Sequence, residues 1–176
     1  FSAYGRVFEV VPFAQSFLNS AIIAGVCSAS VLVSSILAGY SFAKYRFRGR
    51  EALFWLVIGT MFLPPIVTLV PLYNLITSMG LSDSFLGVML PWLANAFGIF
   101  LMRQFIQDVP DELIDAARVD GASEFRIVWV IIVPLIQAAI ITLLVFAIVA
   151  YWNTFLWPCS LLHSPAQYPL LLPRSA

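Results

Sequence analysis

The chain has 176 residues, of which 61% are hydrophobic and 10% are charged, and nine basic residues balance nine acidic ones. Its mean hydropathy is +0.96. A soluble domain has about one-quarter charged residues, so this composition excludes an ordinary soluble fold and predicts a protein whose solvent is lipid. No basic patch of the kind that nucleic acid requires is visible, which argues against a nucleic-acid partner.

Charged residues divide the sequence into four long uncharged runs, the last of which contains only His163. Because a helix needs about 20 apolar residues to cross a bilayer, each run is predicted to hold one spanning helix. The expected ranges are Phe17–Tyr40, Ala52–Tyr73, Phe85–Arg103 and Trp129–Trp157. The predicted fold class is an all-α integral membrane protein, a polytopic bundle of about four transmembrane helices in a single domain over residues 1–176.

The basic residues predict an orientation. Seven of the nine lie in two segments: Lys44, Arg46, Arg48 and Arg50 in the first, and Arg103, Arg118 and Arg126 in the second. Loops on the cytoplasmic side carry the excess of Lys and Arg. We therefore expect both segments to be cytoplasmic, and the turn around Asp83 and both ends of the chain to be external.

Small residues recur at four-residue spacing in the first predicted helix, in two groups: Ala21, Gly25 and Ala29, then Ser35, Gly39 and Ala43. Such a face lets two helix backbones approach closely, although ordinary small-residue content is an equal alternative. Pro64, Pro65, Pro71 and Pro91 lie at membrane depth, where each removes a backbone donor and tends to bend a helix. Cys27 and Cys159 are interpreted as small buried apolar residues.

The stretch between the last two predicted spans, about residues 104–128, is rich in charge but is patterned as a helix, a sharp turn and a second helix. Pro110 suits a first helical position, followed by acidic residues that favour the positive helix end. Gly121 is expected to end this helix in a positive-φ conformation, and Ser123 to cap the next one. Residues of one helical face are Leu113, Ala116, Ala117 and Asp120.

This face presents almost no side chain at its two alanines, a shape that fits the groove of another protein. A solvated helical connector is the equal alternative on chemistry alone.

The spacing in this segment resembles the EAA loop of binding-protein-dependent ABC importer permeases. That motif has Glu-Ala-Ala, then Gly, Ile and Leu-Pro at fixed intervals. The matching positions here are Asp115, Ala116, Ala117, Gly121, Ile131, Val133 and Pro134. Asp115 replaces Glu and Val133 replaces Leu. The predicted ATPase-coupling site consists of Asp115, Ala116, Ala117, Asp120, Gly121, Ile131 and Pro134.

Two further stretches, Gly39–Arg50 and Trp152–Pro158, resemble the carbohydrate-uptake permeases of the maltose and glycerol-phosphate type, in particular the MalG-like second subunit. The resemblance implies a multi-pass permease of the bacterial or archaeal cytoplasmic (inner) membrane. It also implies one more span before Phe1 and one after Ala176.

The expected partners are a second permease subunit, cytoplasmic ATPase subunits that bind the ATP, an external solute-binding protein and membrane lipid. The resemblance implies a solute that is a sugar, oligosaccharide or polyol phosphate. A permease for a polyamine, peptide or phosphonate is the alternative within the same class.

Catalysis by the chain itself is not expected. The only lysine, Lys44, follows Ala43, so there is no phosphate-cradling Gly-Lys-Ser/Thr. An intramembrane enzyme is the alternative from another class, but no Asp or Glu lies within a predicted span. Neither cofactor nor metal is predicted. Polar residues within the spans are open candidates for either solute contact or helix–helix hydrogen bonds: Asn19, Ser30, Ser34, Thr60, Thr68, Asn74, Asn95, Gln137, Thr142 and Asn153.

Overall fold

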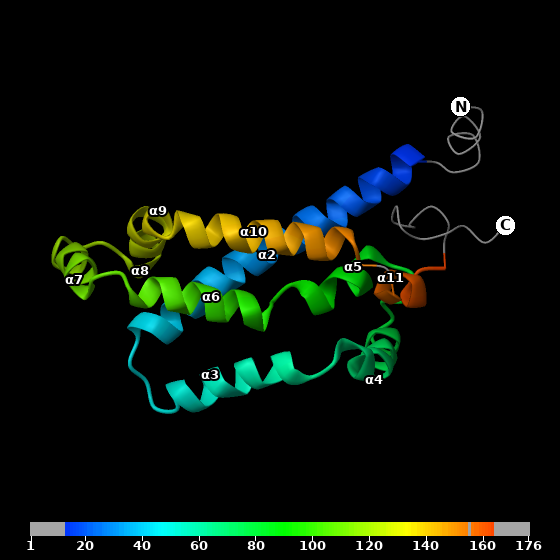
Figure 1. Ribbon diagram of the computed structural model, residues 1–176, viewed down its shortest axis with the longest axis horizontal. Helices are drawn as coiled ribbons and strands as arrows, with labels where there is room; N and C mark the ends of the chain where they lie inside the picture. The colour runs from blue at the N-terminus through cyan, green and yellow to red at the C-terminus, as the bar shows by residue number, and fades with distance from the viewer. Residues whose placement is uncertain (1–12, 155, 164–176) are drawn as a thin grey trace. The chain divides into compact units, whose positions relative to one another are not determined.

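The computed structural model describes residues 13–154 and 156–163, and within these ranges it is helical without a strand (Figure 1). Of the described helices, one is long and apolar enough to cross a membrane alone. The number of crossings rises to as many as four if each of three bent helix pairs is one span. The predicted all-α class is therefore confirmed. Arg174 and the two chain ends lie outside the described residues.

The first predicted span is a single long helix, α2, over Phe13–Lys44. The other three predicted spans are each interrupted, so each of these runs forms a bent helix pair in place of one straight helix. The elements that replace them are α3 (Arg50–Gly59) with η1 (Thr60–Phe62) and α4 (Pro65–Ser78); α5 (Phe85–Met89) with η2 (Leu90–Trp92) and α6 (Ala96–Gln107); and η3 (Ile127–Ile132) with α9 (Val133–Leu135) and α10 (Gln137–Trp152).

Each interruption has a local cause. Leu63 is extended with φ −78° and ψ 119°, as the residue before a proline prefers. Asn95 is also extended, and its side chain accepts a hydrogen bond from the Gly98 amide, which makes it the N-cap of α6. In the last run, Pro134 has no amide to donate. The helices on either side of Ile136 meet at 85°.

The chain forms two compact units, and helices α2 and α10 each contribute residues to both. The first unit contains residues 1–28, 65–92 and 147–176, and the second contains 29–64 and 93–146. The first unit holds α4, α5 and α11 (Leu156–Leu161), and its core includes Ile76, Val88, Trp157 and Leu161. Asp83 is its only described carboxylate.

Two hydrogen bonds in the first unit join the loop at Asp83 to the end of α11. The Asp83 amide donates to the Leu161 carbonyl, and the His163 amide donates to the Asp83 carboxylate. His163 is exposed and lies just after the end of α11, outside any helix.

The second unit packs α6 closely against α2, as the small-residue spacing predicted. A Cβ on Gly39 would lie 2.7 Å from the Met102 Cβ, and a Cβ on Gly98 would lie 2.3 Å from the Ser35 hydroxyl oxygen. Only glycine permits these distances. The other predicted group of small residues does not act in this way, because nothing lies within 4 Å of a Cβ on Gly25.

Hydrogen bonds between α2 and the chain just before α6 extend this packing. The Ser30 and Ser34 hydroxyls both donate to the Leu93 carbonyl. Both serines therefore form hydrogen bonds within the protein, from α2 to the segment that connects η2 and α6.

Buried cysteine was predicted at two positions and is found at one. Cys27 is fully buried, whereas Cys159 is exposed, and both are free thiols. The exposure of Cys159 corrects the prediction, since α11 is a short helix that buries its Trp157 and Leu161 side instead.

Candidate functional site

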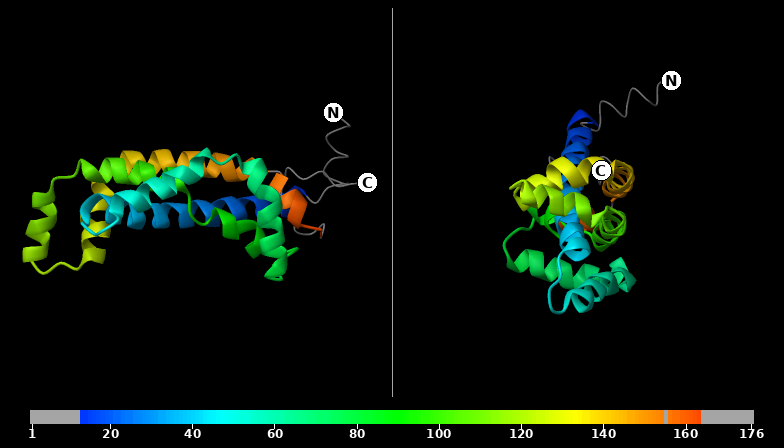
Figure 2. Two further views of the ribbon diagram at one scale, coloured as in Figure 1. Left: turned by 90° about the horizontal axis from the view of Figure 1, so that it is seen from below. Right: turned by 90° about the vertical axis from the view of Figure 1, so that its left-hand side faces the viewer.

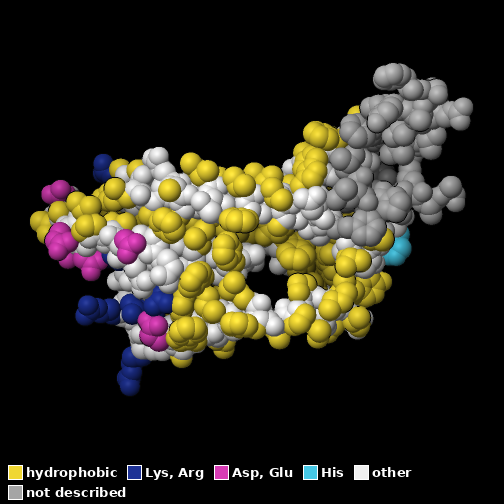
Figure 3. Space-filling view, in the orientation of Figure 1, with side chains coloured by type: hydrophobic (Ala, Val, Ile, Leu, Met, Phe, Trp, Pro, Cys, Tyr) yellow, Lys and Arg dark blue, Asp and Glu magenta, His cyan; other side chains and the backbone are white. Residues whose placement is uncertain are grey.

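The second unit carries the segment that resembles a coupling loop, and it holds every described Lys and Arg. In Figure 3 acidic and basic side chains gather over α7 (Asp111–Val119) and over the link between α2 and α3.

Helix α7 is the short helix that the sequence predicted, with one difference at its start. Pro110 is the N-cap residue in an extended conformation, so Asp111, not Pro110, is the first helical residue. The difference follows from the ring of proline, which permits either position because its missing amide is not required at a helix start. Asp111 and Glu112 occupy the first turn, where their charges favour the helix N-terminus.

Gly121 ends α7 in the predicted manner. Its φ is 79°. Its amide donates to the Arg118 carbonyl, and the Ala122 amide donates to the Ala117 carbonyl. This pair of hydrogen bonds is the Schellman arrangement, which satisfies the last carbonyls of a helix and reverses the chain. Ser123 then caps α8 (Glu124–Arg126) by accepting a hydrogen bond from the Arg126 amide, again as predicted.

The predicted coupling residues in α7 and its terminal turn are accessible. Asp115, Ala116, Asp120 and Gly121 are exposed, and Ala117 is half-buried. The opposite side of the helix is anchored by Ile114, which is 2% exposed. A helix held on one side with small residues on the other leaves its backbone open to a partner.

Apolar side chains surround this exposed surface. Val119 is 88% exposed and Phe125 is 68% exposed. The two remaining predicted residues lie in the helix that follows: Ile131 is half-buried in η3, and Pro134 is exposed in α9. Fully exposed apolar side chains beside a charged helix are typical of a protein-binding surface.

An ionic network that the sequence analysis missed holds the loop in shape. Arg118 lies between two carboxylates, 3.1 Å from Asp115 and 2.8 Å from Glu124. The Glu124 carboxylate also accepts a hydrogen bond of 2.7 Å from the Tyr40 hydroxyl of α2. The hydrogen bond to Glu124 holds the pKa of the Arg118 guanidinium above its usual range. The turn at Gly121 is therefore closed by Arg118 and tied to α2 by Tyr40.

A second tie joins the start of α7 to the end of α2. The Lys44 ammonium lies 2.7 Å from the Asp111 carboxylate and also donates to the Val109 carbonyl. Its side chain is 7% exposed. The Lys44 hydrogen bond holds the pKa of the exposed Asp111 carboxyl below its usual range. The start of α7 and the turn after it are thus both linked to α2.

The guanidinium of Arg103 forms a third polar centre, between α6 and α3. It lies 3.8 Å from the centre of the Phe54 ring and 2.9 Å from the Glu51 carboxylate. Its side chain is 9% exposed, whereas that of Glu51 is 54% exposed. The buried arginine is stabilised by an aromatic face and one carboxylate.

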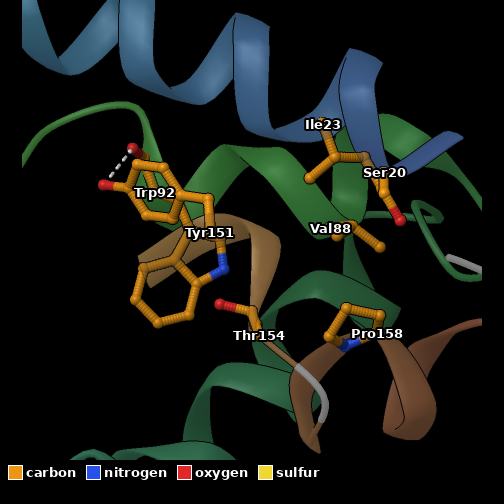
Figure 4. Close-up of a pocket in the computed structure, with 7 residues that line it drawn as sticks. All are labelled: Ser20, Ile23, Val88, Trp92, Tyr151, Thr154 and Pro158. Atoms are coloured by element: carbon orange, nitrogen blue, oxygen red, sulfur yellow. Dashed lines mark hydrogen bonds between the residues drawn. The ribbon is translucent and has the colours of Figure 1, made fainter. Parts of the chain in front are cut away.

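Two cavities in the first unit are candidates for solute contact. The smaller, about 10 Å³, is drawn in Figure 4, in which Ser20 and Ile23 of α2 lie across from Thr154 and Pro158. Its volume is about that of one water molecule. The Tyr151 hydroxyl beside it donates to the Trp92 carbonyl over 3.4 Å.

The larger cavity, about 570 Å³, is open and mainly apolar. Two tryptophans line it, Trp92 and Trp157, together with Thr68 and Asn153 from the predicted polar candidates. Neither a charged side chain nor a histidine lies among its described lining residues. No group of three or more His, Cys, Asp or Glu side chains that could hold a metal ion occurs in the described ranges.

The described residues are helical, and along the chain the short helix α7 and its capped turn lie between two bent helix pairs that could each span a membrane (Figure 2). Residues 30–176 match the model of the family described as "Binding-protein-dependent transport system inner membrane component". The chain belongs to this family.

The chain is similar to two curated relatives. It is 39% identical over 147 residues to the sn-glycerol-3-phosphate transport system permease protein UgpE of Yersinia pestis bv. Antiqua (strain Antiqua), covering 84% of this chain and 52% of that protein. It is 35% identical over 154 residues to the arabinooligosaccharides transport system permease protein AraQ of Bacillus subtilis (strain 168), covering 88% and 55%. The chain spans about half the length of these relatives.

A solved structure shares the fold. A chain from the crystal structure of a bacterial ABC transporter involved in the import of the acidic polysaccharide alginate superposes with a TM-score of 0.88 at 29% sequence identity. The match covers 97% of this chain and 60% of that chain.

Proposed function

We propose that this chain is the membrane-spanning permease portion of a binding-protein-dependent ABC importer. The observation that carries the proposal is the exposed surface at Asp115, Ala116 and Asp120 on a helix that is linked to α2 at its start and through the turn after it. A helix held in this way can bind the groove of an ATPase and pass the movement of that partner to α2. ATP is then bound by the partner, and the chain itself performs no catalysis.

The solute is proposed to be a sugar, oligosaccharide or polyol phosphate. Support comes from the relatives, one named for sn-glycerol-3-phosphate transport and one for arabinooligosaccharides. A second permease subunit and an external solute-binding protein complete the proposed transporter in the cytoplasmic membrane. Uptake assays over a panel of carbon sources test the solute class. An uptake defect confined to amino acids or polyamines would assign the permease to another solute class.

Two substitutions in the loop test the coupling role. Gly121→Val imposes a cost of roughly 1–2 kcal/mol on the positive-φ turn, because a Cβ clashes in that conformation. Asp115→Lys places a second cation beside Arg118. We expect both variants of the full-length permease to insert into the membrane, to lose ATPase during co-purification from solubilised membranes, and to lose transport.

The matched control for the glycine is Gly25→Val, since Gly25 lies inside α2 with open space around it. Arg174→Ala, at a position outside the described residues, is expected to transport normally. If both loop variants retain ATPase and transport, α7 is only a connector.

A further inference from the structure

The loop between α2 and α3, residues 44–50, contains four cations, and we call it the basic loop. Two of the four are already neutralised: Lys44 by Asp111 at 2.7 Å, and Arg50 by Glu51 at 3.0 Å. In the described part of the chain, Arg46 and Arg48 form no ion pair, and both are exposed. The positive charge of Arg46 contributes to lowering the pKa of Asp111, but it is Lys44 that binds that carboxylate.

The backbone of the basic loop is ordered by its own contacts. Gly49 has a φ of 86°, which turns the chain into α3. The Arg50 guanidinium donates to the Tyr45 carbonyl over 3.2 Å, and the Phe47 ring lies 6.2 Å from that of Phe42 in α2. An open hollow of about 640 Å³ is lined by residues 46–52. Arg46 and Arg48 are among the residues that line this hollow.

Apolar side chains continue from this hollow along α3. Phe54 and Ile58 are buried on one side of the helix, while Leu53, Trp55 and Leu56 on the other are 50%, 66% and 67% exposed. Phe47, between the two arginines, is 42% exposed. A surface that places free guanidinium groups next to exposed aliphatic and aromatic groups matches a molecule with an anionic head and an apolar tail.

We propose that the basic loop binds the phosphate headgroup of an anionic phospholipid through Arg46 and Arg48, with the exposed side of α3 against the acyl chains. Guanidinium groups form directed, charge-assisted hydrogen bonds to phosphate. Basic residues directly after a spanning helix attract anionic lipid, and tryptophan is enriched at the membrane interface. Because α3 is part of a predicted span, the lipids against its exposed apolar side carry their headgroups at the level of the basic loop, so lipid is a better occupant than an acidic protein surface. The proposal does not depend on which solute is transported.

The test uses the full-length permease, assembled with its partner subunits, purified in detergent and stripped of lipid. Dioleoylphosphatidylglycerol, dioleoylphosphatidylcholine and inorganic phosphate are titrated separately, and bound lipid is counted by native mass spectrometry. The variant is Arg46→Gln with Arg48→Gln. Each lost charge is expected to weaken phosphatidylglycerol binding about fivefold, or roughly 25-fold together, while phosphatidylcholine binding is unchanged.

Two further variants are controls. Arg126→Gln removes an exposed charge elsewhere in the same unit and should leave lipid binding as in the wild type. The pair Arg46→Lys and Arg48→Lys keeps the charge and should retain preference for phosphatidylglycerol. Should the glutamine pair not assemble, Arg48→Gln alone and a salt titration of the wild type replace it, since binding must weaken as salt screens the charges.

Three outcomes overturn the proposal. One is equal phosphatidylglycerol binding by the glutamine pair and the wild type. Another is complete displacement of the lipid by inorganic phosphate, which would identify a site for free phosphate. The third is loss of the co-purified ATPase with lipid binding intact, which would assign the basic loop to a protein partner. Loss of lipid binding with ATPase and transport retained supports the lipid site and leaves the importer function separately intact.

Discussion

The Tyr40 hydroxyl donates a 2.7 Å hydrogen bond to the Glu124 carboxylate across 84 positions of sequence. Tyr40 belongs to the longest helix of the chain, and Glu124 lies just after the turn that ends the proposed coupling helix. Because Glu124 also binds Arg118, three side chains link α7 to α2.

Tyr40→Phe removes the donor of this bond and keeps the ring. We expect the free energy of unfolding to fall by about 1.5–3 kcal/mol, the usual contribution of a hydrogen bond to a charged group. In the assembled transporter, more ATP should be hydrolysed per solute imported. The measurements are thermal unfolding and the ratio of ATP hydrolysis to uptake in proteoliposomes. Tyr73→Phe is the control, since the described structure gives the Tyr73 hydroxyl no hydrogen bond; equal coupling in both variants would contradict this role for Tyr40.

Glu51→Gln leaves the Arg103 guanidinium buried without its carboxylate. The uncompensated charge should lower the free energy of unfolding by roughly 1–3 kcal/mol. The partly exposed position of Glu51 keeps the loss at the lower end of that range. Thermal unfolding of the detergent-solubilised protein measures it. Glu112→Gln, an exposed residue of α7, provides the comparison, and an equal change in both variants would show that the Arg103 pair contributes nothing.

Gly39→Leu should force α6 away from α2. Even a Cβ at this position would lie 2.7 Å from the Met102 Cβ and 2.9 Å from the backbone nitrogen of Arg103. Overpacking of this kind costs typically 1–3 kcal/mol or more. The loss should appear as a lower thermal midpoint and a smaller yield of folded protein. Gly25→Leu in the same helix meets open space and should be tolerated; similar behaviour of the two variants would show that the close packing has no energetic role.

Asp111→Asn is expected to lower the thermal midpoint at neutral pH but to have little effect in acid. Lys44 depresses the pKa of Asp111 in the folded protein. A carboxyl whose pKa is depressed by folding stabilises the folded state fully when the pH is above the pKa of the unfolded chain, about 3.9. This stabilisation is lost as the pH falls through the pKa of the folded protein. Thermal unfolding of the wild type and the variant at pH 7 and near pH 3 measures this. A difference of equal size at both pH values would contradict the role of the charge.

The sequence predicted features that depend on local chemistry. Long uncharged runs identify membrane helices, because each backbone group in lipid must find its partner within the helix. The end of α7 was predictable because Gly121 and Ser123 lie within a few residues of the helix-end backbone groups whose hydrogen bonds they complete. The proposed coupling residues were identified through a resemblance whose residues lie within 20 positions of one another, and their coupling role stays a prediction.

The interruptions of three spans were only partly predictable. Pro64 signalled the first bend, but Pro71 lies inside the continuous helix α4. Asn95 and Ile136 interrupt runs that are apolar on both sides, where hydropathy does not distinguish a straight helix from a bent one. The outcome at each depends on whether neighbouring helices supply partners for the freed backbone groups.

The sequence alone determined that the chain is a helical membrane protein, where its cations gather, and where α7 ends. These properties follow from the transfer of apolar side chains into lipid and from backbone geometry over a few residues. Only the tertiary structure decided that Tyr40 binds Glu124, that Lys44 binds Asp111, and that Arg103 is buried on Phe54. Each of these pairs joins residues far apart in sequence, and no local pattern selects one partner over another until the helices have packed.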